Sequence, residues 1–157
     1  MIQLDKTNVM RILDSKQITY VPHYYDNNIV DGLSVSAILN QPPTQVFKTL
    51  VTVGNNLLHY VFVIPVNKSL NLKKAAKAVN IKSIEMIKQS ELLPLTGYIH
   101  GGCSPIAMKK PFITVINSSA QNQPTICVSA GKIGCQIELN PYILATLINC
   151  KFDDIVD

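Results

Sequence analysis

The sequence has 157 residues, enough for one domain of ordinary size, and we expect a single domain over residues 1–157. Its 47% hydrophobic and 15% charged residues exclude a disordered chain, and no apolar run reaches the roughly 20 residues that a membrane-spanning helix needs. The net charge of +4 comes with a single arginine, Arg11, among 14 basic residues, which argues against a DNA-binding protein that reads bases through arginine.

The chain begins with two predicted helices. The segment "KTNVMRILDSKQI" (6–18) places Val9, Ile12 and Leu13 at helical spacing between polar residues. The segment "DGLSVSAILN" (31–40) repeats the pattern more briefly and stops at the prolines of "QPPT".

A β-hairpin and a third helix follow. The β-rich runs "QVFKTLVTV" (45–53) and "LLHYVFVIPV" (57–66) are separated by "GNN", a strong turn signal. The segment "LNLKKAAKAV" (70–79) returns to helical spacing, with lysines on its exposed side. Those lysines serve either solubility or a binding patch, and solubility is the simpler interpretation.

The last third predicts three short strands and a closing helix. The runs "PFITVINSSA" (111–120), "TICVSAG" (125–131) and "CQIEL" (135–139) are separated by polar turns, as in a meander. Asn140 and Pro141 then suit the N-cap and first position of a helix. The predicted fold class is α+β, with one mixed, mostly antiparallel sheet flanked by helices, because the βαβ alternation of a Rossmann fold is absent.

The N-terminal segment and the cysteines indicate the compartment. Asp5, Lys6 and Arg11 occupy the stretch where a signal peptide would be apolar, so we expect a cytoplasmic protein. The four cysteines lack any CxxC pair, and reduced thiols are the expected state.

Lys48 is the first candidate functional residue, because it interrupts an apolar strand in "VFKTL". Such a cation is either a charge that protects an edge strand or a group that points into a cleft, and the strand pattern alone favours the edge. Thr49 adds a hydroxyl that matters only if this strand faces a ligand.

Two glycine-containing loops are further candidates. In "LTGYIHGGCSPIAMKK" (95–110), Cys103 follows His100 by three residues, but a nucleophilic pair needs geometry that spacing cannot supply. "VSAGKIG" (128–134) lacks the phosphate-binding P-loop pattern and fits a hairpin turn or a ligand contact. The histidines and cysteines do not have the spacing of a zinc site, and neither a metal nor another cofactor is expected.

Five segments taken in order resemble the YbaK/EbsC family of aminoacyl-tRNA deacylases. The segments read "VFKTL", "LNLKKAAKA", "GYIHGGCSPIAMKK", "VSAGKIG" and "KFDDI", and the resemblance as a whole runs from about Lys6 to Ile155. The resemblance is strongest to the free-standing YbaK type, which is similar to the editing domain inserted in bacterial prolyl-tRNA synthetases. It implies a barrel-like sheet flanked by helices and removal of cysteine wrongly attached to tRNA(Pro), an error that arises because cysteine and proline are close in size.

The resemblance also implies the site residues. Lys48 matches the lysine on which family activity depends, which reverses the edge-strand preference, and Gly101 matches the first position of the family's GxxxP loop. These two are the implied catalytic residues. The implied substrate-binding residues are Tyr25, Thr49, Tyr98, Gly102, Cys103, Ser104, Pro105, Ser129 and Gly131. The chain departs from the family pattern at His100, where many relatives carry arginine, and at Gln136, where some carry an acid.

The mechanism that the resemblance implies uses no protein nucleophile. The thiol of the mischarged cysteine attacks its own ester carbonyl, forming a cyclic thioester and freeing the tRNA, so the activity can be classed as a lyase or an ester hydrolase step. The implied partners are the 3' end of tRNA(Pro) and, transiently, prolyl-tRNA synthetase. Two alternatives stay open: a deacylase for another substrate such as Ala-tRNA(Pro), and a non-catalytic module that binds tRNA or the synthetase.

Overall fold

The computed structural model describes residues 6–157. Residues 1–5 lie outside the described part. They are the first residues of the expected domain and belong to the N-terminal segment from which export was judged. The helices are α1 (Asn8–Ser15), α2 (Gly32–Ile38), α3 (Leu72–Ala78), α4 (Gln89–Thr96), the 3₁₀ helix η1 (Ser118–Asn122) and α5 (Pro141–Leu147). The strands are β1 (Val21–Tyr24), β2 (Phe47–Gly54), β3 (His59–Pro65), β4 (Ile84–Met86), β5 (Ile113–Asn117), β6 (Ile126–Lys132), β7 (Cys135–Leu139) and β8 (Lys151–Asp153). No helix in this part of the chain combines the length and the apolarity that crossing a membrane requires.

Side-chain caps explain where the predicted helices begin. Thr7, Asp31, Asn71 and Asn140 each accept a hydrogen bond from a backbone N–H in the first turn of α1, α2, α3 and α5. Each cap satisfies a donor that the helix itself leaves free. The helices predicted from these four segments, including the Asn140–Pro141 start, are confirmed.

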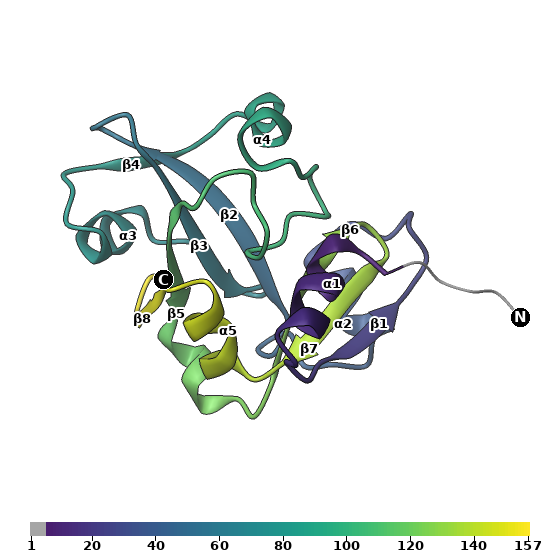
Figure 1. The fold of residues 1–157 in the computed structure, drawn as a ribbon. Coiled ribbons are helices and arrows are strands. Elements are labelled where there is room, and N and C mark those ends of the chain that lie inside the picture. Colours follow the sequence, from purple (N-terminus) through teal and green to yellow (C-terminus); the bar gives the residue numbers. More distant parts are fainter. Residues whose placement is uncertain (1–5) are drawn as a thin grey trace, which may run out of the picture.

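The strands form two sheets, so the expectation of one continuous sheet is wrong. One sheet has the order β1-β7-β6 and the other the order β4-β2-β3-β5-β8. Figure 1 shows α1 and α2 beside the smaller sheet, and α3, α4 and α5 around the larger one. A parallel bridge between Val46 and Cys127 joins the sheets where β2 begins. The predicted class, α+β with mostly antiparallel pairing, is confirmed.

The expected three-stranded meander is also wrong. β6 and β7 do form an antiparallel hairpin, but β5 belongs to the other sheet, where it runs parallel to both β3 and β8. The reason is the connection: η1 and Pro124 lie between β5 and β6 and carry the chain from one sheet to the other. The β2–β3 hairpin, by contrast, is formed as predicted.

Side chains of β3 and β5 alternate between two separate regions of the hydrophobic core. Val63 and Ile116 face a cluster that also contains the buried side of α1 and the apolar side chains of β6 and β7. Their neighbours Phe62 and Val115 face a second cluster under α3. β3 is therefore apolar on both faces, which accounts for the continuous hydrophobic run in its sequence.

The β6–β7 hairpin has one apolar and one polar face. Val128 and Ile137 pair across the hairpin and belong to the core with α1. The alternate pairs are Ser129 with Gln136 and Cys127 with Glu138. Because side chains alternate between faces, these four residues lie together on the side away from α1.

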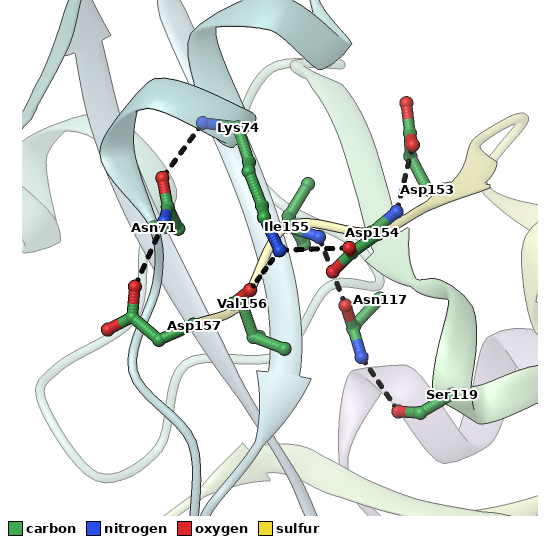
Figure 2. Close-up of polar contacts among 9 residues, drawn as sticks. All are labelled: Asn71, Lys74, Asn117, Ser119, Asp153, Asp154, Ile155, Val156 and Asp157. Carbon is green, nitrogen blue, oxygen red and sulfur yellow. Dashed lines mark hydrogen bonds and ion pairs between the residues drawn. The ribbon is translucent and has the colours of Figure 1, made fainter.

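The segment after β8 is held against α3 and the end of β5. Figure 2 shows Lys74, Asn117 and the residues from Asp153 to Asp157. Lys74 Nζ donates to Val156 O at 2.8 Å and to Asp154 Oδ2 at 2.9 Å. The backbone N–H of Ile155, whose side chain is fully buried, donates to Asn117 Oδ1 at 3.1 Å. A buried asparagine side chain therefore satisfies a backbone donor that no strand pairing reaches.

We expect Asn117→Ala to lower the free energy of unfolding by about 1–3 kcal/mol, because the buried N–H of Ile155 loses its acceptor. Urea denaturation followed by circular dichroism measures the change. Ser119→Ala is the matched control, since it removes only the bond from Asn117 Nδ2 to Ser119 Oγ (2.8 Å) and leaves the Ile155 bond in place. Equal losses in the two variants would contradict this role for Asn117.

Candidate active site

A pocket opens where the start of β2 meets the polar face of the β6–β7 hairpin. Its volume of ≈ 300 Å³ is at the lower end of the range for small-molecule sites. Six of the residues expected from the sequence line it: Tyr25, Lys48, Thr49, Gly101, Cys103 and Ser129. His100 and Gln136, the two departures from the family pattern, line it as well.

Lys48 lies in the half of β2 that β4 does not reach. β3 borders β2 along its length, with Lys48 opposite Ile64, whereas β4 pairs only with Thr52–Gly54. Lys48 is half-buried and lines the pocket. Lys48 therefore fits both interpretations, because it lies in a part of β2 that is not paired with β4 and its side chain lines a cleft.

The polar wall of the pocket has acceptor atoms that are free to bind a ligand. Gln136 donates from Nε2 to the Tyr25 hydroxyl at 3.5 Å. Within residues 6–157, neither Gln136 Oε1 nor Thr49 Oγ1 has a hydrogen-bond partner, although both atoms are buried. Buried polar atoms are rarely left without partners, so these two favour a polar ligand in the pocket. Burial also raises the pKa of Tyr25, which keeps its hydroxyl neutral.

The loop after α4 needs both of its adjacent glycines. Gly101 has φ of +88°, and a Cβ there would lie 2.3 Å from Val30 Cγ1. A Cβ on Gly102 would lie 3.0 Å from the backbone N of Ile133 and 3.1 Å from Lys132 Cα. Only glycine lets this loop reach the pocket while it contacts the β6–β7 turn.

Five expected residues do not line the pocket: Tyr98, Gly102, Ser104, Pro105 and Gly131. Tyr98 donates its hydroxyl to Ile106 O at 2.5 Å, and burial raises its pKa to about 12. A Cβ on Gly131 would lie 3.2 Å from the Tyr98 ring. Ser104 is buried, and its Oγ accepts from Ile106 N at 3.2 Å. These contacts stabilise the loop after α4 and its packing against Gly131 without lining the pocket.

The environment of Cys103 disfavours the nucleophile hypothesis. Burial raises the pKa of this thiol to about 12, and a weaker hydrogen bond with Thr96 acts in the opposite direction. The thiolate is the reactive form of cysteine, and it is scarce at neutral pH when the pKa lies so high. Cys103 therefore contributes a small side chain to the pocket wall.

Sequence reasoning missed several lining residues, among them Asp31 and Leu92. Asp31 caps α2 by accepting hydrogen bonds from Ser34 N at 3.0 Å and from Ser34 Oγ at 2.6 Å. These bonds, with a smaller contribution from the charge of Lys48, lower the pKa of Asp31. Asp31 directly precedes the segment "GLSVS", so the preference of aspartate for the N-cap could have identified its role. Leu92 gave no signal, because α4 itself was not predicted.

The pocket can hold a small polar group between a cation and a glycine loop. Lys48 supplies positive charge, Thr49 and Gln136 supply free acceptors, and Gly101 allows close approach to the backbone. Among the described residues, one group of three could share a metal ion: His23, Cys127 and Glu138. These three lie beside the pocket and are not part of its lining.

Comparison with known proteins assigns the family. Residues 27–147 match the aminoacyl-tRNA editing domain. EbsC of Enterococcus faecalis, provisionally named a Cys-tRNA(Pro)/Cys-tRNA(Cys) deacylase, is 44% identical over 152 residues, which cover 96% of this chain and 93% of EbsC. The resemblance read from the five segments is thereby confirmed.

Solved structures share the fold. The crystal structure of hypothetical protein APE2540 superposes with a TM-score of 0.88 at 20% identity, covering 95% of this chain and 99% of that one. A structure described provisionally as a trans-editing enzyme for prolyl tRNA synthetase gives a TM-score of 0.83 at 19% identity, covering 98% and 99%. At these identities the likeness concerns the fold, whereas the sequence match decides the family. The chain belongs to the aminoacyl-tRNA editing domain family.

Proposed function

We propose that this chain, acting as a single domain over residues 1–157, is a trans-editing deacylase that removes cysteine from Cys-tRNA(Pro) and also accepts Cys-tRNA(Cys). The observation that carries the proposal is the ≈ 300 Å³ pocket, which brings Lys48, the Thr49 hydroxyl and the Gly101 loop to one cavity. Membership of the editing domain family and 44% identity to a relative named for these two substrates support it.

In this proposal, charge and backbone shape position the ester. The Lys48 ammonium group binds the terminal phosphate or polarises the ester carbonyl, and Gly101 lets that carbonyl approach the loop. The free acceptors on Thr49 and Gln136 suit the α-ammonium group of the aminoacyl moiety, which would supply the missing hydrogen bonds.

The reacting thiol belongs to the substrate. Its sulfur bonds to the carbonyl carbon, the ester C–O bond breaks, and the thiol proton passes to the ribose oxygen of the departing tRNA. The high pKa of Cys103 supports this assignment, because the thiol in the pocket lining is then mostly protonated at neutral pH. In this proposal the pocket accelerates deacylation by holding the substrate thiol close to its own ester, since intramolecular attack gains from proximity.

The proposed partner is prolyl-tRNA synthetase, bound transiently in the cytoplasm. A single arginine among 14 basic residues offers little for reading tRNA bases, and a pocket of ≈ 300 Å³ holds an aminoacyl group and not a tRNA. In this proposal the synthetase selects tRNA(Pro), and this chain selects the amino acid.

A deacylation panel tests the function. With purified protein and labelled Cys-, Ser- and Ala-tRNA(Pro), we expect cysteine to be released faster than serine by roughly a hundredfold or more, because a hydroxyl is a weaker nucleophile than a thiol. Spontaneous hydrolysis without protein gives the baseline. When Cys-tRNA(Cys) is added to the panel and prolyl-tRNA synthetase is present, cysteine should be released faster from Cys-tRNA(Pro) than from Cys-tRNA(Cys).

Each other outcome contradicts a defined part of the proposal. Equal release of cysteine and serine would refute attack by the substrate thiol. Faster release of alanine would indicate an alanine editing enzyme. Salt-sensitive tRNA binding without deacylation at any protein concentration would indicate a binding module. Equal rates on Cys-tRNA(Pro) and Cys-tRNA(Cys) with synthetase present would refute selection by the synthetase.

A further inference from the structure

Three potential metal ligands converge on the polar face of the smaller sheet. His23 comes from the edge strand β1, Glu138 from the central strand β7, and Cys127 from β6. Cys127 is the direct cross-strand partner of Glu138. His23 lies opposite Gln136, which is two residues before Glu138 in β7. The register of the sheet thus brings together residues that lie up to 115 positions apart in the chain.

The spacing of the ligand atoms fits one small ion. The imidazole nitrogen, the thiol sulfur and a carboxylate oxygen all lie within 4.8 Å of one another. Zinc binds nitrogen and oxygen ligands at about 2.0–2.2 Å and sulfur at about 2.3 Å, so ligands on one ion lie within roughly 4.6 Å of one another. The pair His23 Nε2 and Glu138 Oε1, now 2.8 Å apart, has only to separate slightly to admit the ion.

The surroundings hold the carboxylate in place. Thr125 Oγ1 donates to Glu138 Oε2 at 2.6 Å and in turn accepts from Gln45 Nε2 at 2.9 Å. Gln41 Nε2 lies 3.4 Å from the oxygen that faces His23. Outer partners of this kind orient metal-binding carboxylates, and this set leaves Oε1 directed at the imidazole.

The cluster is accessible from one side. Cys127 is fully buried, whereas the side chains of His23 and Glu138 are 22% and 19% exposed. An ion can therefore enter past the histidine and the carboxylate, and a water molecule can complete a four-ligand set. The thiol and imidazole favour a zinc-like ion over Mg²⁺ or Ca²⁺, which prefer oxygen ligands.

We propose that His23, Cys127 and Glu138 form a binding site for one zinc-class divalent ion. Binding replaces the thiol proton of Cys127 with the metal, and the proton is released to solvent. The site links the edge strand β1 to β6 and β7, and Tyr25 of the pocket follows His23 by two residues. A bound ion thus anchors the strand that positions Tyr25. This inference does not depend on the proposed function.

Cobalt titration of the chelator-treated full chain tests the site. Co²⁺ bound by a thiolate gives a near-ultraviolet charge-transfer band, which we expect to saturate at one ion per chain and to disappear on addition of excess Zn²⁺. The band should be lost in Cys127→Ser, and binding should weaken tenfold or more in His23→Gln and Glu138→Gln. Cys150→Ser, a substitution away from the cluster, is the matched control and should keep the band.

A second measurement keeps the test valid if Cys127→Ser fails to fold. Zn²⁺ should raise the melting temperature of the unaltered chain and of Cys150→Ser but not that of His23→Gln, which alters a partly exposed side chain. An absent band, a band retained in Cys127→Ser, or equal stabilisation by Mg²⁺ would overturn the proposal.

Discussion

Lys48→Ala is expected to abolish deacylation of Cys-tRNA(Pro) while the protein stays folded. Lys48 supplies positive charge directly in the pocket, and the substrate ester and its neighbouring phosphate are the groups that a cation stabilises. We expect kcat/KM to fall by roughly a thousandfold, in line with the loss of a group that stabilises developing charge. Single-turnover deacylation with excess enzyme measures the chemical step.

Two further variants separate this role from other effects. Lys73→Ala removes an exposed lysine from α3 and controls for the loss of one positive charge, so it should keep its activity. Cys103→Ala should keep most of its activity, because its thiol is not the nucleophile in the proposed reaction. Full activity in Lys48→Ala, or a loss of activity in Cys103→Ala that matches it, would refute the proposed chemistry.

Gly101→Ala should lower kcat/KM by roughly a hundredfold, because small displacements of positioning groups have effects of that size. The new Cβ would lie 2.3 Å from Val30 Cγ1, and the backbone at φ +88° disfavours any side chain. The loop must then move away from the pocket, and the substrate carbonyl loses its place. Deacylation kinetics and thermal melting together measure the effect.

Gly97→Ala is the matched control for backbone strain. Its φ is +85°, nearly that of Gly101, but a Cβ there would make only an ordinary contact of 3.4 Å with Lys109 Cγ, away from the pocket lining. It should lose stability with little loss of activity. Adding Val30→Ala to Gly101→Ala should restore part of the activity. Equal losses of activity in the two single variants would show that strain, and not the position of the loop, is responsible.

Local patterns predicted α1, α2, α3, α5 and the hairpins, but they missed α4 and could not predict how the sheets assemble. The "GNN" turn and the Asn140–Pro141 helix start are encoded by neighbouring residues, and both are found in the structure. The parallel pairing of β5 with β3 depends on contacts about fifty positions apart, and it was missed. The short strands β1, β4 and β8 carry too few residues to show a period, and Pro22 in β1 is tolerated because β1 is an edge strand.

The site was predicted in part, and through resemblance more than through periodicity. The strand pattern alone favoured an edge role for Lys48, whereas the five-segment resemblance directed attention to the pocket that this lysine lines. The same resemblance could not tell residues that line the cavity from those that brace it, such as Tyr98 and Ser104. The convergence of His23 with Glu138 depends on strand register, which one sequence does not reveal.

Core residues alternate with pocket residues along the β6–β7 hairpin, and this alternation limits how the sequences of related domains can change. Every second residue supports the core, and the residues between them, such as Ser129 and Gln136, face the pocket. Substitution at these positions can therefore change which ligand is accepted without repacking the interior. Insertion of a single residue, by contrast, would exchange the two faces and place polar groups in the core. We therefore expect specificity among relatives to vary by replacement in these strands, with changes in length confined to the loops.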